Sequence, residues 1–90
     1  MHKIVLVTTE GCEACTIAEA NVDIAIGQVD KVDALEIKDW HKESKDFIIK
    51  NHIKDFPTVL YIIDDKVIHK AVGSYPSAVY LRWIDMYFKN

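Results

Sequence analysis

The chain has no long apolar segment. Its first apolar run covers only residues 4–7, whereas a signal peptide needs a longer apolar centre and a membrane-spanning helix needs about 20 apolar residues. We therefore expect neither a leader nor a membrane span, and we expect the protein to lie in the cytoplasm. Thiols in that compartment face a reducing pool, so a permanent structural disulfide is not expected.

The chain also lacks a basic stripe, an internal repeat and a linker. It carries 11 lysine and arginine residues against 14 aspartate and glutamate residues, which gives a formal net charge of −3. Nucleic-acid-binding surfaces are strongly basic, so a nucleic-acid partner is disfavoured. With 90 residues, 50% of them hydrophobic, residues 1–90 form one domain around a single small core.

Cysteine is scarce, and both copies, Cys12 and Cys15, stand in the stretch TEGCEACTI. A zinc site needs four ligands, and this pair supplies two. The chain has four histidines, at His2, His41, His52 and His69. Their spacing does not complete a zinc finger, so we expect no metal site and place the histidines on the surface without a role. Inert buried thiols are the other alternative, because cysteine is commonly buried.

The apolar pattern predicts the element order β-α-β-α-β-β-α. Strands are predicted at residues 4–7, 32–37, 56–63 and 67–72, with a turn at 64–66 that makes the last two a hairpin. Helices are predicted from Glu13 to Gly27, over about residues 42–51 with Asp39 as the cap, and after residues 74–76. Alternating strands and helices favour parallel pairing, so we expect a four-stranded mixed sheet flanked by helices in an α/β fold.

The last predicted helix has more aromatic residues than one buried stripe needs. The stripe consists of Tyr80, Leu81, Ile84 and Phe88. Trp83 and Tyr87 lie four residues apart and form either the rim of the core or a contact patch for a dimer. We favour the rim, and we expect a monomer.

The position of the cysteines favours redox chemistry. Cys12 follows a predicted buried strand and begins a predicted helix, where free N–H groups and the helix dipole favour a thiolate. The two intervening residues let Cys15 come within disulfide reach one turn further on. Cys12 would then be the exposed, attacking thiol, and Cys15 would close the ring and release the reduced substrate.

With these motifs the chain resembles the thioredoxin-like superfamily over nearly its whole length. The matches are CEAC at residues 12–15, FPT at 56–58 and VG at 72–73. The resemblance implies a cis peptide bond at Pro57 and a substrate groove formed by Phe56, Pro57 and Gly73, in which Phe56 pairs with an extended substrate strand. It also implies a protein-disulfide oxidoreductase with no cofactor beyond a redox-active Cys12–Cys15 disulfide.

The same resemblance implies partners and a cellular role. The expected substrates are protein disulfides, the expected electron donor is of the thioredoxin-reductase type, and the role is electron transport in cell redox homeostasis. The glutathione-binding signature of glutaredoxins, a Gly-Gly pair before the last helix, is largely absent from GSYP at residues 73–76. A glutathione-dependent glutaredoxin is therefore the less favoured alternative.

Several positions depart from the thioredoxin pattern. Gly11 replaces the tryptophan before the first cysteine, and Glu13 and Ala14 replace the glycine and proline between the cysteines. The buried aspartate of thioredoxins falls at about Leu6 here, and its lysine companion near Leu35. We therefore expect an apolar floor beneath the cysteines. A second class of function is a non-catalytic adaptor that binds a protein in the same groove.

Two glutamates, Glu10 and Glu13, bracket Cys12 and are expected to modulate the pKa of its thiol. A negative neighbour disfavours a thiolate and opposes the helix terminus, each effect being of order a kcal/mol or less at an exposed site. We expect the two effects to cancel. Cys12 would then be less acidic than in strong oxidants, and the potential of the pair would lie toward the reducing end.

Overall fold

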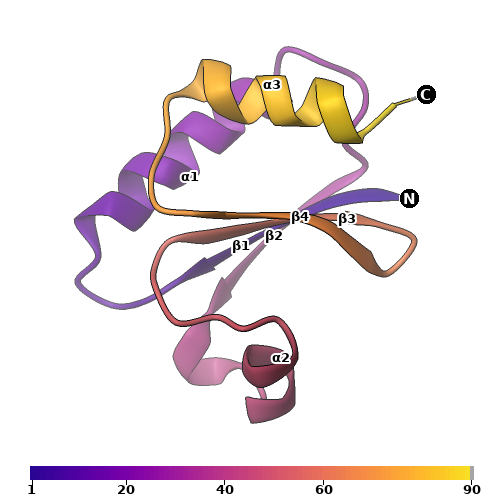
Figure 1. Ribbon diagram of the computed structural model, residues 1–90. Coiled ribbons are helices and arrows are strands. Elements are labelled where there is room, and N and C mark those ends of the chain that lie inside the picture. Colours follow the sequence, from indigo (N-terminus) through magenta and orange to yellow (C-terminus); the bar gives the residue numbers. More distant parts are fainter. Residues whose placement is uncertain (90) are drawn as a thin grey trace.

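The computed structural model describes residues 1–89 and shows a four-stranded mixed sheet with helices on both faces (Figure 1). The elements in chain order are β1 (His2–Thr8), α1 (Glu13–Ile26), β2 (Ala34–Asp39), the 3-10 helix η1 (Trp40–Lys42), α2 (Lys45–Lys50), β3 (Thr58–Ile63), β4 (Lys66–Val72) and α3 (Ser77–Tyr87). This arrangement confirms the predicted fold class. No helix within residues 1–89 is both long enough and apolar enough to cross a membrane.

The strand order β2-β1-β3-β4 places β1 and β3 at the centre of the sheet. β1 runs parallel to β2 and antiparallel to β3, and β3 runs antiparallel to β4. In the register of the parallel pair, Thr8 lies opposite Asp39, so the segments that follow β1 and β2 leave the sheet at the same edge. β4 contains a bulge, because Tyr61 pairs with His69 and the next residue, Ile62, pairs with Val67.

The face of the sheet covered by α1 and α3, here the α1/α3 face, holds the larger core. Its fully buried members include the aromatic residues Tyr61, Tyr80 and Phe88. The Tyr61 hydroxyl donates a hydrogen bond to the Tyr80 carbonyl oxygen at 3.2 Å, and burial raises the pKa of the Tyr61 phenol. Large rings and small α1 residues such as Ala18 and Val22 thus fill one continuous cluster.

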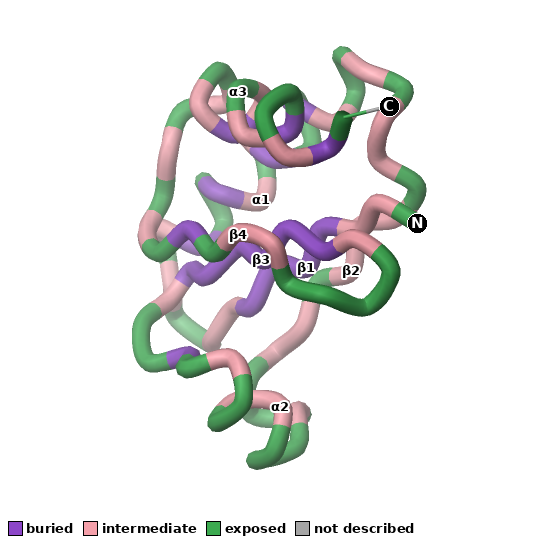
Figure 2. The backbone as a smooth tube through the Cα atoms, turned by 45° about the vertical axis from the view of Figure 1, so that its right-hand side comes forward, coloured by how far each residue is buried: buried purple, intermediate pink, exposed green. Residues whose placement is uncertain are grey.

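The opposite face, here the α2 face, is covered thinly. Its buried residues are Val5, Val7, Ile53, Leu60 and Ile62. The only apolar side chains that α2 packs against them, Phe47 and Ile48, are themselves half exposed. Figure 2 shows α2 in the colours of intermediate and exposed residues only, so this short helix covers the sheet without a buried stripe of its own.

The helix predicted over residues 42–51 is wrong at its start. Asp39 caps η1 instead, since its Oδ1 accepts a hydrogen bond from the His41 N–H at 3.0 Å. The chain is then extended at Ser44, whose hydroxyl accepts the Phe47 N–H at 3.2 Å and begins α2. Asp39 and Ser44 are both good N-caps, and each side chain begins its own short helix.

The strand boundaries also differ from the prediction, and β1, for example, covers His2–Thr8 and not residues 4–7. β2 covers Ala34–Asp39 and not residues 32–37, and β3 begins at Thr58 and not at residue 56. Pro57 has no N–H to donate to the neighbouring strand, which is why the regular ladder starts only after it. The expected hairpin turn is present, with Asp64 and Asp65 both in the left-handed region.

The aromatic residues of α3 form the rim of the core, as predicted. Trp83 and Tyr87 are half buried and pack against the α1/α3 cluster. The prediction that the histidines lie on the surface is wrong for His69. Its ring stacks on Tyr87 with centroids 4.6 Å apart, lies 4.8 Å from Trp83, and its Nε2 is buried without a partner among the described residues. Burial lowers the pKa of His69.

Candidate functional site

The turn between β1 and α1 places the cysteines at the carboxyl edge of the sheet. Gly11 has a φ of +65°, in the left-handed region that favours glycine. A Cβ at this position would meet no atom within 4 Å. Backbone conformation and not space therefore explains glycine here, where the resemblance to thioredoxins had called for tryptophan.

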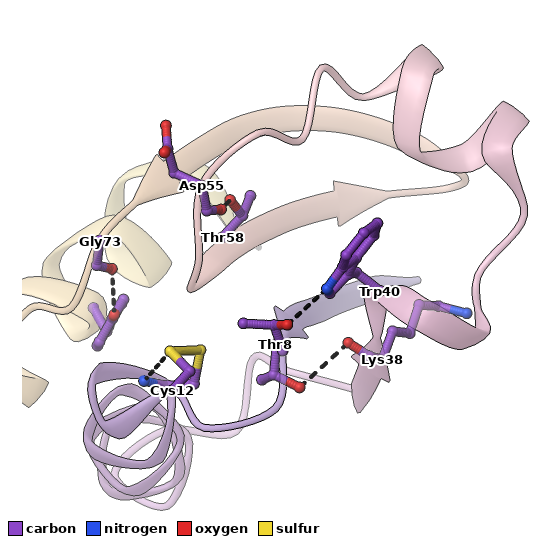
Figure 3. Close-up of a disulfide and its surroundings, with 10 residues drawn as sticks. Thr8, Cys12, Lys38, Trp40, Asp55, Thr58 and Gly73 are labelled. Carbon is purple, nitrogen blue, oxygen red and sulfur yellow. Dashed lines mark hydrogen bonds between the residues drawn. A yellow bond between two sulfur atoms is a disulfide. The ribbon is translucent and has the colours of Figure 1, made fainter.

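Cys12 is the N-cap of α1, and Cys15 lies in the first turn of that helix. The two residues form a disulfide with their Cα atoms 5.2 Å apart, within the range that a disulfide requires. Cys15 is 4% exposed, whereas Cys12 is of intermediate exposure. Cys12 therefore presents the more accessible sulfur (Figure 3).

The helix terminus acts directly on the Cys12 sulfur. The Cys15 N–H points at Cys12 Sγ with a nitrogen–sulfur distance of 3.0 Å. The first N–H groups of a helix have no partner within the helix, and they stabilise a negative charge placed at the N-cap. This geometry suits a Cys12 sulfur that becomes a thiolate when the disulfide is reduced.

A shallow depression of about 430 Å³ lies beside the disulfide. It is lined by Thr8, Thr9, Gly11, Cys12, Glu13, Cys15, Thr16 and Glu19. The ionisable side chains of this lining, apart from the cysteines, are the carboxylates Glu13 and Glu19. Glu10 is exposed on the turn before Cys12, so the structure brings Glu13 to the depression and leaves Glu10 outside its lining.

A second segment faces the cysteines from β3 and β4. The peptide bond between Phe56 and Pro57 is cis, and Pro57 is buried. Beyond the last β3–β4 pair, the Gly73 N–H donates to the Pro57 carbonyl oxygen at 2.9 Å, with Gly73 at a φ of +101°. In Figure 3, Gly73 and Thr58 lie on the far side of the disulfide from α1.

The sheet beneath this site is apolar. Leu6 is fully buried in the α1/α3 cluster, and Leu35 is half buried against the same cluster. Both positions thus carry the apolar side chains expected from the sequence. Leucine offers no group that could accept a proton from Cys15.

Trp40 lies at the site but was not among the residues predicted from the sequence. Its indole Nε1 donates to the Thr9 hydroxyl at 2.6 Å, and its ring stacks on Phe56 with centroids 5.7 Å apart and an interplanar angle of 30°. The signal in the sequence was a tryptophan directly after a strand that runs parallel to β1. That placement puts Trp40 at the edge that carries the cysteines.

Metal ligands do not gather in the described part of the chain. Within residues 1–89, no group of three or more histidine, cysteine, aspartate or glutamate side chains is arranged to hold a metal ion. The cysteines in this structure are bonded to each other.

No protein-family model matches the chain, and no curated protein matches it in sequence. Several solved structures are similar to the chain in fold. Thioredoxin-2 of the malaria parasite, a component of its protein secretion machinery, superposes with a TM-score of 0.84 over 97% of this chain and 84% of its own, at 17% identity. Thioredoxin from Aeropyrum pernix superposes with a TM-score of 0.76 over 94% of this chain and 73% of its own, also at 17% identity.

A third solved structure is similar to the chain over nearly its whole length. Thioredoxin f2 of Chlamydomonas reinhardtii superposes with a TM-score of 0.76 over 99% of this chain and 82% of its own, at 13% identity. At such identities the likeness establishes architecture and not activity. It supports the resemblance drawn from the motifs, and the chain has the thioredoxin-like fold.

Proposed function

We propose that the protein is a thiol–disulfide oxidoreductase that reduces disulfides in other proteins with Cys12 and Cys15. The observation that carries this proposal is the asymmetry of the pair. Cys12 is the more accessible sulfur and receives the Cys15 N–H at a helix N-terminus, while Cys15 is buried behind it. An exposed attacking thiol and a buried resolving thiol need this arrangement.

The reaction follows from that asymmetry. In the reduced protein the Cys12 thiolate attacks one sulfur of a substrate disulfide, a mixed disulfide forms, and the other substrate sulfur leaves as a thiolate that takes up a proton. Cys15 then gives up its proton to solvent, and its thiolate attacks Cys12 Sγ, forms the intramolecular disulfide and releases the second substrate sulfur as a thiolate that takes up a proton. The substrate gains two electrons and two protons, which an external dithiol must return to the Cys12–Cys15 pair.

The expected partners follow from the resemblance to thioredoxins. Phe56 precedes the buried Pro57, just before β3, and we propose that its backbone pairs with an extended stretch of a protein substrate beside Cys12. We propose a flavin-dependent donor of the thioredoxin-reductase type, a cytoplasmic location, and a role in cell redox homeostasis. The Gly73-Ser74 sequence before α3 supports this donor over glutathione.

The first test is the redox equilibrium of Cys12 and Cys15. The protein is equilibrated in graded dithiothreitol or glutathione buffers, its thiols are trapped by alkylation, and they are counted by intact mass. We expect a reversible two-electron transition between about −200 and −290 mV. A pair that forms no intramolecular disulfide at any buffer composition would contradict the proposal.

A binding module without turnover is the second candidate. The observation in its favour is the fully buried Leu6, an apolar side chain where thioredoxins bury an aspartate. The Cys15→Ser variant separates the two candidates. An oxidoreductase should accumulate mixed disulfides through Cys12 in this variant, with Cys12→Ser as the control that accumulates none, whereas an adaptor should bind its partner equally in all three forms.

A further inference from the structure

Trp40 stands where three segments of the site meet. It is the first residue of η1, directly after β2 ends at Asp39. Because β1 and β2 are parallel and Thr8 lies opposite Asp39, the residues after each strand leave the same edge together. Trp40 therefore adjoins the turn that carries Cys12, although the two are far apart in the sequence.

The side chain of Trp40 makes one contact on each side. Its indole N–H donates to the Thr9 hydroxyl at 2.6 Å, on the turn before Cys12. Its ring stacks on Phe56, the residue before Pro57. Figure 3 shows the indole reaching toward the disulfide turn from the side opposite Gly73. One side chain thus bridges the two segments between which an extended substrate would bind.

The backbone of Trp40 is itself held in place. The preceding residue, Asp39, accepts the His41 N–H at 3.0 Å, and the Trp40 carbonyl oxygen accepts the Glu43 N–H at 3.3 Å. The indole is therefore anchored on a closed 3-10 turn and not on a free loop. With 36% of the residue exposed, part of its surface stays open to solvent.

We propose that Trp40 is a positioning residue, which holds the Thr9 turn against Phe56 and so fixes the width of the groove for polypeptide disulfides. The inference rests on the proposed function. When both walls of the groove are already ordered, binding of an extended substrate loses less conformational entropy. A small disulfide touches little beyond the sulfur atoms, so it gains nothing from that order.

Kinetics with two substrates test this inference. Dithiothreitol serves as the donor, and the substrates are a peptide with one internal disulfide and hydroxyethyl disulfide. Trp40→Phe keeps a ring against Phe56 but removes the indole donor, and Thr9→Val removes the acceptor. We expect each variant to raise KM for the peptide about fivefold, the factor for one net hydrogen bond. We expect kcat for the peptide and both constants for hydroxyethyl disulfide to stay within about twofold.

Matched controls separate this role from a general loss of structure. Thr9→Ser keeps a hydroxyl acceptor and should restore the KM of the original protein. The Trp40→Phe/Thr9→Val double variant should be no worse than either single one, because both remove the same bond. Trp83→Phe changes the chain's other tryptophan, which lies in the α3 rim, and should leave both substrates unaffected.

Hydrogen exchange gives a readout that does not depend on turnover. Amides of residues 9–12 should exchange about fivefold faster in Trp40→Phe than in Trp83→Phe, by the same hydrogen-bond factor. Equal exchange in the two variants, or equal loss of kcat/KM for both substrates, would overturn the inference. If the unaltered protein reduces neither disulfide, the proposed function fails, and the exchange measurement still decides the Trp40 contact.

Discussion

The two faces of the sheet differ in how many apolar residues they bury. On the α1/α3 face, two longer helices bury Tyr61, Tyr80 and Phe88 completely. On the α2 face, a helix of six residues contributes no buried residue. The first face therefore holds the larger set of buried apolar residues, and with it most of the hydrophobic stabilisation.

This difference divides the candidate site. Cys12 and Cys15 begin α1, whose Ala18, Val22 and Ala25 are fully buried. Phe56 and Trp40, by contrast, belong to the lightly covered half. Regions with few buried contacts open more readily than the core. The disulfide thus lies on a rigid base, while the segment proposed as one wall of the substrate groove depends on a few contacts such as that of Trp40.

The largest predicted effect comes from equal truncations on the two faces. Ile84 is fully buried beneath α3, and Ile48 is half exposed on α2. Ile84→Ala should lower the free energy of unfolding by about 2–5 kcal/mol, and Ile48→Ala by about 1 kcal/mol. Urea unfolding followed by circular dichroism measures both. Met86→Ala, at a half-exposed position of α3, is the control. Similar losses in the free energy of unfolding for Ile84→Ala and Ile48→Ala would contradict the difference between the two faces.

A smaller effect is expected at the cap of α2. The Ser44 hydroxyl accepts the Phe47 N–H at 3.2 Å, so Ser44→Ala should destabilise this helix by about 1 kcal/mol. Because α2 is lightly packed, hydrogen exchange should accelerate in α2 and leave α1 unchanged. Ser44→Asp keeps a capping oxygen and should behave like the original protein. Faster exchange throughout the chain would show that the α2 face is not a separate unit.

On the α1/α3 face, His69 is expected to make the free energy of unfolding depend on pH. Its ring lies against Tyr61 of β3 and against Trp83 and Tyr87 of α3, and burial holds its pKa below the usual value. As pH falls, the unfolded chain takes up this proton first. The contribution of the neutral, packed His69 ring to the free energy of unfolding is therefore complete above about pH 6.5. This contribution is lost as pH falls toward the lower pKa that His69 has in the folded state.

The measurement is urea unfolding at pH values from about 7.5 to 5, the range that brackets the usual histidine pKa. His69→Phe should flatten the pH dependence, because the aromatic contacts remain and the titrating group is gone. His52→Asn, at a φ of 52° that asparagine tolerates, is the matched substitution of an exposed histidine. An unchanged pH dependence in His69→Phe would contradict the assignment.

The smallest predicted effect concerns charge at the cysteines. Glu13 lines the depression beside Cys12, and Glu10 is exposed on the turn. Removing either charge favours the Cys12 thiolate and so the reduced protein, which raises the reduction potential. We expect about 10 mV for Glu13→Gln and less for Glu10→Gln, as exposed charges interact weakly. Equilibration with glutathione measures both shifts, and a fall in potential would refute the expected sign.

The sequence predicted best where a residue's own chemistry decides its structure. The apolar run at residues 4–7 predicted a buried strand, and it lies in the central β1. The spacing of the cysteines predicted a pair within disulfide reach, and they form a disulfide at the start of α1. It predicted least where tertiary contacts decide. His69 is half buried because its ring packs against Trp83 and Tyr87 of α3, and Trp40 belongs to the site because two parallel strands end together. Neither fact is visible before the strand order is known.

The bulge in β4 has a consequence for how molecules meet in solution. β4 is an edge strand, and an unpaired strand edge is a template onto which a second chain can add a strand. The extra residue opposite Tyr61 and Ile62 interrupts the regular row of N–H and C=O groups on this strand, and the exposed Lys66 and Lys70 flank the interruption. The open edge is thus a poor template for edge-to-edge aggregation, and a concentrated solution of the protein should resist it.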